Sequence, residues 1–202
     1  MVNNTRQNII NNLIVKYNYK SYLEVGTQNP SSCFDTIKCE NKFCIEPFPL
    51  DTIDKSKINF IGTSDEYFES IKNSDITYDI VFIDGLHHDD QVLRDINNSL
   101  KHLSENGTIV VHDCLPKTKG QQERNDHGGV WLGDVWKAIA YLRINRDDIS
   151  IQVIDTDLGC GIIKRGYNKK WVVNSNDWKT YDYYNSNKKE LMNIVSVQDW
   201  KI

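Results

Sequence analysis

The chain has 202 residues, of which 39% are hydrophobic and 26% are charged, and its formal net charge is −4. This composition predicts one packed domain and argues against intrinsic disorder. The negative charge lacks the basic excess that nucleic-acid binding usually needs, so we expect no nucleic-acid partner. The sequence has no run of about 18 apolar residues and no apolar signal-peptide core, so we expect a cytoplasmic protein without a membrane span.

Five cysteines are present, an odd number, and none of them forms a CxxC pair. Their spacing fits no common zinc motif. We therefore expect reduced structural thiols, as is usual inside cells. The five are Cys33, Cys39, Cys44, Cys114 and Cys160.

The first half of the chain alternates helical and extended patterns. Apolar side chains at helical spacing predict an N-terminal helix over residues 5–18. Short apolar runs that end in Gly or Pro predict strands. The expected elements after the first helix are strands at 21–27, 42–47 and 58–64 and helices at 31–39 and 65–71.

The second half continues this alternation. The apolar run at 78–85 is typical of a central parallel strand that is covered on both faces. A helix with Val92, Ile96 and Leu100 on one side follows, and residues 105–114 predict another buried strand. The polar, glycine-containing segment 116–133 predicts a long loop.

The last predicted strands, 150–156 and 160–166, have only a three-residue connection, which requires an antiparallel pair. Strands that alternate with helices form doubly wound parallel sheets. We therefore expect one α/β domain over residues 1–202, with a mostly parallel, Rossmann-like sheet closed by an antiparallel terminal hairpin. Its core would span about 20–165, and a tail over 171–202 would contain a helix near residues 186–195.

Ligands of such sheets bind beyond the carboxyl ends of the strands. Acidic, glycine and histidine residues recur at these positions, although each also has a structural interpretation. Gly26 could form a simple turn, Glu46 could be a solvated loop acid, and Ser64 with Asp65 could begin a helix. His102, by contrast, is expected on the outer, solvated face of its helix.

Five segments together resemble the class I S-adenosylmethionine (SAM)-dependent methyltransferases. They are YLEVGT, CIEP, TSDEYF, FIDGLHHDDQVLRDI and NGTIVVHDC, within residues 20–165. The last two are similar to the branch that methylates hydroxyls of small molecules and sugars. The first motif departs from the family pattern, because Gln28 and Pro30 replace later glycines.

The resemblance implies a set of ligands at the strand ends. Glu46 would hold the ribose, Ser64 and Asp65 would flank the adenine, and Asp84 would lie beside the amino-acid end of SAM. The full cofactor set is Glu24, Gly26, Thr27, Glu46, Ser64, Asp65, Asp84 and Gly85. Asp84 and Asp113 fit the places where some relatives bind a divalent cation, here Mg²⁺ or Mn²⁺.

A hydroxyl acceptor needs a base or a metal. The catalytic candidates are Asp84 and three histidines, His87, His88 and His112; of the neighbouring pair, one should face the site and the other should support the helix start.

Segment 116–133 would act as a lid, with Arg124, His127 and Trp131 contacting a sugar or glycan acceptor. The alternatives are a phenolic or other small natural-product acceptor and a non-catalytic interaction module. An NAD-dependent oxidoreductase would normally show GxGxxG, which this chain lacks. A homodimer is left open.

Overall fold

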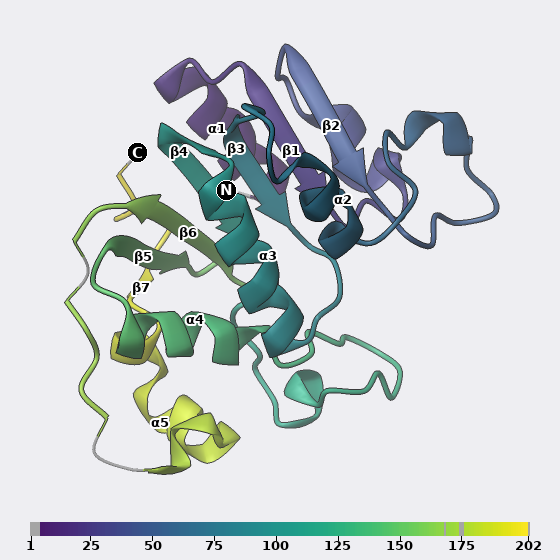
Figure 1. Ribbon diagram of the computed structural model, residues 1–202. Helices are drawn as coiled ribbons and strands as arrows, with labels where there is room; N and C mark the ends of the chain where they lie inside the picture. The colour runs from purple at the N-terminus through teal and green to yellow at the C-terminus, as the bar shows by residue number, and fades with distance from the viewer. Residues whose placement is uncertain (1–4, 168, 174–175, 202) are drawn as a thin grey trace.

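The computed structural model describes residues 5–167, 169–173 and 176–201, which form helices around a central sheet (Figure 1). The α-helices are α1 (Arg6–Tyr17), α2 (Ser64–Ile71), α3 (Asp89–Lys101), α4 (Val135–Asn145) and α5 (Tyr181–Leu191). The strands are β1 (Ser21–Val25), β2 (Asn41–Ile45), β3 (Tyr78–Ile83), β4 (Leu103–Val111), β5 (Ile149–Ile154), β6 (Cys160–Arg165) and β7 (Ile194–Val195). Short 3₁₀ turns are η1 (Pro30–Ser32), η2 (Phe34–Thr36), η3 (Lys55–Lys57), η4 (Gly120–Gln122) and η5 (Asn176–Lys179).

The strands form one sheet in the order β2-β1-β3-β4-β6-β5-β7. The first four are parallel, and β6 is antiparallel to both of its neighbours, β4 and β5. The predicted doubly wound sheet with an antiparallel terminal hairpin is therefore confirmed. The short strand β7 adds a parallel edge to β5 that the sequence did not predict.

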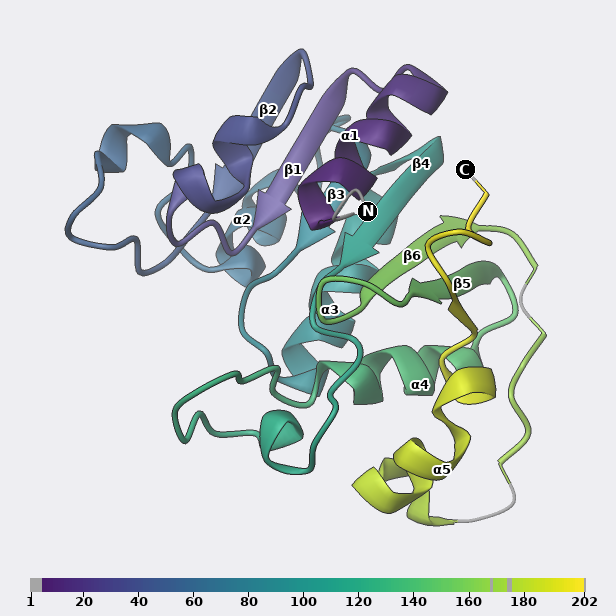
Figure 2. The same ribbon diagram turned by 180° about the vertical axis from the view of Figure 1, so that it is seen from behind.

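Apolar side chains alternate between the two faces of the sheet. Leu23 and Val81 belong to a core shared with α2, α3, α4 and α5, whereas Tyr22 and Phe82 belong to a core shared with α1. Figures 1 and 2 show α3 and α4 on one side of the sheet and α1 on the other. Strand residues that are buried on both faces of a sheet must be apolar, which explains the continuous apolar runs at 80–83 in β3 and at 109–111 in β4.

Two expected elements of the first half are wrong. Residues 58–64 do not form a strand, because only the bridge between Ile45 and Phe60 is present and the Asn59 side chain accepts the bond from Cys44 N (2.9 Å). Residues 31–39 form two 3₁₀ turns instead of a helix. Cys33 between these turns has φ −145°, and the Thr36 hydroxyl donates back to its carbonyl, which competes with helical bonding.

Two further expectations need correction. The C-terminal helix starts five residues earlier than predicted, because the Thr180 hydroxyl caps it by accepting from Tyr183 N. His102 is buried rather than solvated. Its Nδ1 lies 2.9 Å from Ile76 O, and its ring stacks on Phe68 at a centroid distance of 6.0 Å.

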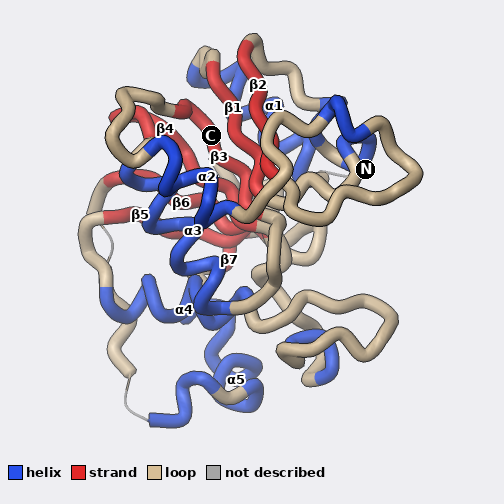
Figure 3. The backbone as a smooth tube through the Cα atoms, turned by 45° about the vertical axis from the view of Figure 1, so that its right-hand side comes forward, coloured by secondary structure: helices blue, strands red, loops and turns tan. Residues whose placement is uncertain are grey.

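The parallel strands β1 to β4 place their carboxyl ends on one edge of the sheet. Figure 3 shows the long loops after β2 and β4 extending on the same side of the molecule. This edge is where parallel sheets bind ligands. Among the described residues, no helix is both long and apolar enough to cross a membrane.

Candidate active site

A cleft of about 810 Å³ opens at the carboxyl ends of the parallel strands. It brings together twelve of the residues selected from the sequence. They are Glu24, Gly26, Thr27, Glu46, Ser64, Asp65, Asp84, Gly85, His87, His112, Asp113 and Trp131. Positions that are up to about a hundred residues apart in the chain therefore meet in one site because they end neighbouring strands.

Gly26 lets the loops after β1 and β3 touch. Its φ is +87°, and a Cβ at this position would lie 2.3 Å from Asp84 O and from Gly85 Cα. Both the backbone conformation and the space therefore require glycine. The contact places the cofactor-loop candidates of β1 directly beside the acid that follows β3.

The carboxylate of Glu46 joins the loops after β1 and β2. It is 7% exposed and accepts hydrogen bonds from Gln28 N (2.8 Å) and Phe48 N (2.7 Å). Each carboxylate oxygen can accept more than one bond, so the group still has capacity for ribose hydroxyls. The alternative of a solvated loop acid does not fit this burial.

Ser64 and Asp65 begin α2, where Thr63 and Glu66 form a capping box. Behind them lies Asp95 of α3, which the sequence analysis missed. Asp95 is 1% exposed and accepts from Ser64 Oγ (2.6 Å) and Gln91 Nε2 (3.0 Å). Burial raises the pKa of Asp95 to about 6. The sequence signal that could have identified Asp95 is an acidic residue next to the apolar positions of α3.

Glu24 forms part of the cleft wall but is 2% exposed. The Tyr22 hydroxyl donates a hydrogen bond to its carboxylate. Burial raises the pKa of Glu24 to about 7. These contacts indicate that Glu24 supports the loop after β1 from inside the protein.

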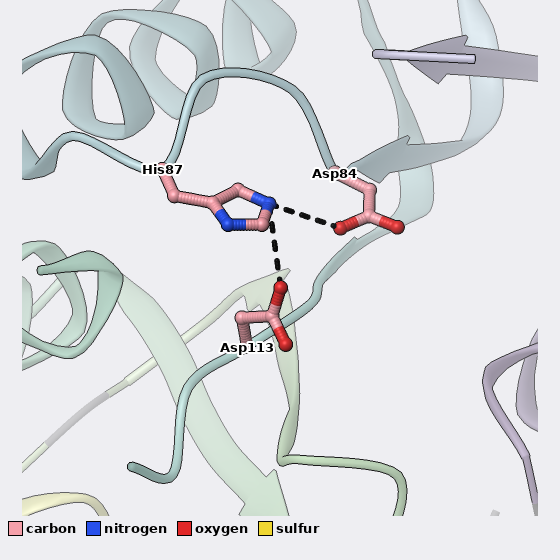
Figure 4. A group of neighbouring side chains, drawn as sticks. All are labelled: Asp84, His87 and Asp113. Atoms are coloured by element: carbon pink, nitrogen blue, oxygen red, sulfur yellow. Dashed lines mark ion pairs between the residues drawn. The ribbon is translucent and has the colours of Figure 1, made fainter. Parts of the chain in front are cut away.

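Asp84, His87 and Asp113 converge above the ends of β3 and β4 (Figure 4). His87 Nε2 lies 3.5 Å from Asp84 Oδ1 and 3.3 Å from Asp113 Oδ2. Asp113 holds a left-handed backbone conformation (φ 59°) that is uncommon outside glycine and often found at functional sites. The two acids are the metal ligands predicted from the sequence, and the fold adds His87.

The three side chains fit a divalent cation. Two carboxylates and one imidazole are a donor set that Mn²⁺ and related ions accept, and Mg²⁺ binds through carboxylates. Ligands about 2.1 Å from one ion lie about 3 Å apart in an octahedral site, close to the separations seen here.

His112 lies behind this cluster, 5% exposed, between three carboxylates. Its Nδ1 is 3.2 Å from Asp84 Oδ1 and 3.3 Å from Asp113 Oδ1, and its Nε2 is 3.7 Å from Asp157 Oδ1. Burial alone would lower the pKa of His112, but the carboxylates outweigh it and raise the pKa to about 12. A histidine that stays protonated is a poor general base, which argues against that role for His112.

Two further residues of this network were missed in the sequence. Arg6, on the first turn of α1, is within 3.3 Å of His112 Nε2 through its Nη1. Asp157, in the β5–β6 connection, accepts from Arg6 N at 2.7 Å and has φ 45°. Arg6 stands far from every strand end in sequence. The Asp-Leu-Gly turn containing Asp157 was the only available signal.

The remaining candidates lie outside the cleft. His88 occupies the N-cap position of α3 without a side-chain capping bond, and its Nε2 is 3.1 Å from Arg124 O, whereas His87 lines the cleft. Arg124 binds Asp89 and Asp90 of α3, and His127 is exposed. Of the three predicted acceptor contacts, only Trp131 lines the cleft.

Comparison with known proteins agrees with this architecture. Residues 52–114 match the family model described as a methyltransferase domain. The structure resembles the O-methyltransferase TomG from Streptomyces achromogenes in complex with SAM (TM-score 0.55, 16% identity, 78% of each chain). It also resembles an O-methyltransferase from Bacillus cereus in complex with SAH, with a TM-score of 0.55 and 14% identity over 81% of this chain and 80% of that chain.

The protein has the class I methyltransferase fold. A third similar structure is MycE, a methyltransferase from the mycinamycin biosynthetic pathway, in complex with Mg and SAH. It has a TM-score of 0.51 and 17% identity, over 82% of this chain and 50% of MycE. A search of curated proteins gives no match. In this methyltransferase fold, the matched family segment runs through α2, β3, α3 and β4 and ends just after Asp113.

Proposed function

We propose that this protein is a SAM-dependent O-methyltransferase that acts on a hydroxyl of a small molecule. The observation that carries the proposal is the charge of the cleft. Among the described residues that line it, seven are acidic and one is Arg or Lys. SAM carries a sulfonium and an ammonium group, so an acidic cleft at the end of a parallel sheet suits it. The acids are Glu24, Glu46, Asp65, Asp84, Asp95, Asp113 and Asp126.

The fold supports the same cofactor. The similar structures named above carry SAM or SAH. In this chain SAM would lie with its ribose at Glu46, its adenine near Ser64 and Asp65, and its methionine end beside Gly26 and Asp84. The close approach of the loops at Gly26 provides the narrow backbone surface that this end needs.

Methyl transfer requires the acceptor oxygen, the methyl group and the sulfur in line, so positioning supplies much of the rate. Asp84, His87 and Asp113 would hold a divalent cation. When bound, the cation would orient an acceptor hydroxyl and lower its pKa. Protonated His112 lies behind Asp84 and Asp113. Burial opposes ionisation of Asp84, but its hydrogen bond and charge interaction with His112 outweigh burial and hold the pKa of Asp84 well below its usual range.

His87 is the base that acts when the site holds no cation. Burial lowers its pKa, but Asp84 and Asp113 reverse this effect and raise the pKa. A proton accepted at Nε2 would lie between the two carboxylates and be stabilised by both. His88 has no such access, because it faces Arg124.

We propose a sugar hydroxyl, free or within a glycan, as the acceptor. Trp131 and Asp126 of the loop line the cleft, and an aromatic ring next to a carboxylate offers both an apolar face and a hydrogen-bond acceptor. The competing acceptor is a phenol. Phe48 and Leu86, 82% and 52% exposed, give the cleft mouth an apolar character that a phenol would also use.

The test is a methyl-transfer assay with labelled SAM, a panel of saccharides and a panel of phenols. We expect label in saccharides. Label only in phenols would overturn the sugar acceptor and leave the methyltransferase proposal standing. Absence of SAM binding by calorimetry would overturn the proposed function as a whole.

A further inference from the structure

Arg6 is the only arginine or lysine among the described residues that line the cleft. It belongs to α1, which lies on the face of the sheet opposite α3 (Figure 2). Its side chain lines the cleft, where its Nε is 3.8 Å from Asp84 Oδ2. Its side chain is 23% exposed. Arg6 therefore gives an otherwise acidic cleft one positive group that an anionic part of a ligand can reach.

The contacts of Arg6 fix its position without using all of its donors. Its backbone N–H and its Nη1 both bind Asp157, at 2.7 Å and 3.4 Å. Its Nε is buried and makes no hydrogen bond among the described residues, since Asp84 Oδ2 at 3.8 Å is too distant. A buried guanidinium donor without a partner is costly, so a ligand acceptor would be favoured there.

The two ends of a methionyl group need opposite charges. The ammonium suits the acids around Gly26, and the carboxylate needs a cation. His112 cannot supply it, because the ring is 5% exposed and three carboxylates already surround it. Arginine binds carboxylates strongly through its planar fork of N–H groups.

We propose that the Arg6 guanidinium binds the carboxylate of the methionine moiety of SAM, so that α1 completes the cofactor site. This inference rests on the proposed function. It makes the first turn of α1 part of the cofactor site, with Asp157 holding Arg6 in place from the β5–β6 connection.

The test compares SAM with decarboxylated SAM, which keeps both positive groups and lacks only the carboxylate. Calorimetry should show that the wild-type protein binds SAM about 10- to 100-fold more tightly, the range expected for a hydrogen bond to a charged group. Arg6→Met should bring the two dissociation constants together, mainly by weakening SAM. Arg6→Lys, which keeps the charge and loses the fork, should retain part of the preference.

Arg146→Met is the matched control, because Arg146 pairs with exposed Asp148 at the end of α4, away from the cleft. It should leave the preference unchanged. Equal binding of both cofactors by the wild-type protein overturns the inference even if Arg6→Met does not fold. A full preference that survives in a folded Arg6→Met protein also overturns it. A wild-type protein that binds neither cofactor instead shows that the proposed function is wrong.

Discussion

The imidazole of His87 is stacked on the indole of Trp131, with ring centroids 4.9 Å apart and an interplanar angle of 28°. The indole Nε1 in turn donates to Glu123 O at 2.8 Å, within the loop after β4. The end of the loop is tied to the same histidine, because Asp134 N donates to His87 O at 3.0 Å. The orientation of the site histidine therefore depends on the order of this loop.

Replacing Trp131 with Ala should lower kcat/KM for the acceptor about tenfold, the effect of losing one aromatic pair of about 1–1.5 kcal/mol. Trp131→Phe should retain most of the activity because the stacking remains. Steady-state kinetics with saturating SAM would measure both variants. Equal loss in both would mean that the Nε1 bond, and not the stacking, orders the loop.

Glu46→Ala should weaken SAM binding by about 1–3 kcal/mol, the range for hydrogen bonds to a charged group. The change removes the proposed ribose acceptor and also frees Gln28 N and Phe48 N. Calorimetry against Glu105→Ala, an exposed acid on β4, provides the comparison. Unchanged affinity in Glu46→Ala would remove Glu46 from the cofactor site.

Gly26→Ala should destabilise the fold by about 2 kcal/mol or more, since the new Cβ would overlap the β3 loop and φ is positive. For a chain of this length, the midpoint of thermal unfolding should fall by about 4–8 °C. Gly120→Ala is the matched control, because a Cβ there meets nothing within 4 Å. Equal midpoints for the two variants would contradict the tight contact between Gly26 and Asp84.

Asp95 predicts a pH dependence of stability. Its pKa in the folded protein is about 6, above the value of about 3.9 expected in the unfolded chain. The stabilisation that Asp95 contributes to the folded state is therefore fully present below about pH 4 and is lost as the pH rises through about 6. The free energy of unfolding changes by about 3 kcal/mol over this range. Asp95→Asn keeps an oxygen for Ser64 and Gln91 and should lose this dependence. Denaturant unfolding of the cofactor-free wild-type and Asp95→Asn proteins, measured from pH 4 to 8, tests this prediction. If the free energy of unfolding depends on pH in the same way in both proteins, Asp95 is not the group responsible.

The cation proposal predicts that calorimetry detects Mn²⁺ binding in the wild-type protein. Asp113→Asn should weaken it at least tenfold, because a neutral amide replaces a proposed ligand. Asp148→Asn, an exposed acid outside the cleft, should leave it unchanged. Activity that survives exhaustive chelation would reject the cation and leave His87 as the base.

Local pattern was sufficient to predict the sheet and to bring most of the candidate residues to one edge of it. The apolar runs of β3 and β4 identify strands covered on both faces, and the short Asp-Leu-Gly connection specifies an antiparallel hairpin. Because parallel strands end at one edge, the positions of Glu46, Asp84 and Asp113 in the sequence are enough to group them in one site. The apolar pattern at residues 58–64 wrongly predicted a strand. There the Asn59 side chain accepts the hydrogen bond from Cys44 N that the backbone of a paired strand would have accepted.

Only the tertiary structure decided the electrostatics of the site. Arg6 and Asp157 lie 151 residues apart, and no periodicity links an N-terminal helix to a hairpin turn. The roles of the histidines also depended on packing, since His87, His88 and His112 are alike as residues. Packing stacks one on Trp131, turns one toward Arg124 and surrounds one with three carboxylates. A side chain's charge and partners depend on what the fold brings within a few ångströms, and sequence spacing does not carry that information.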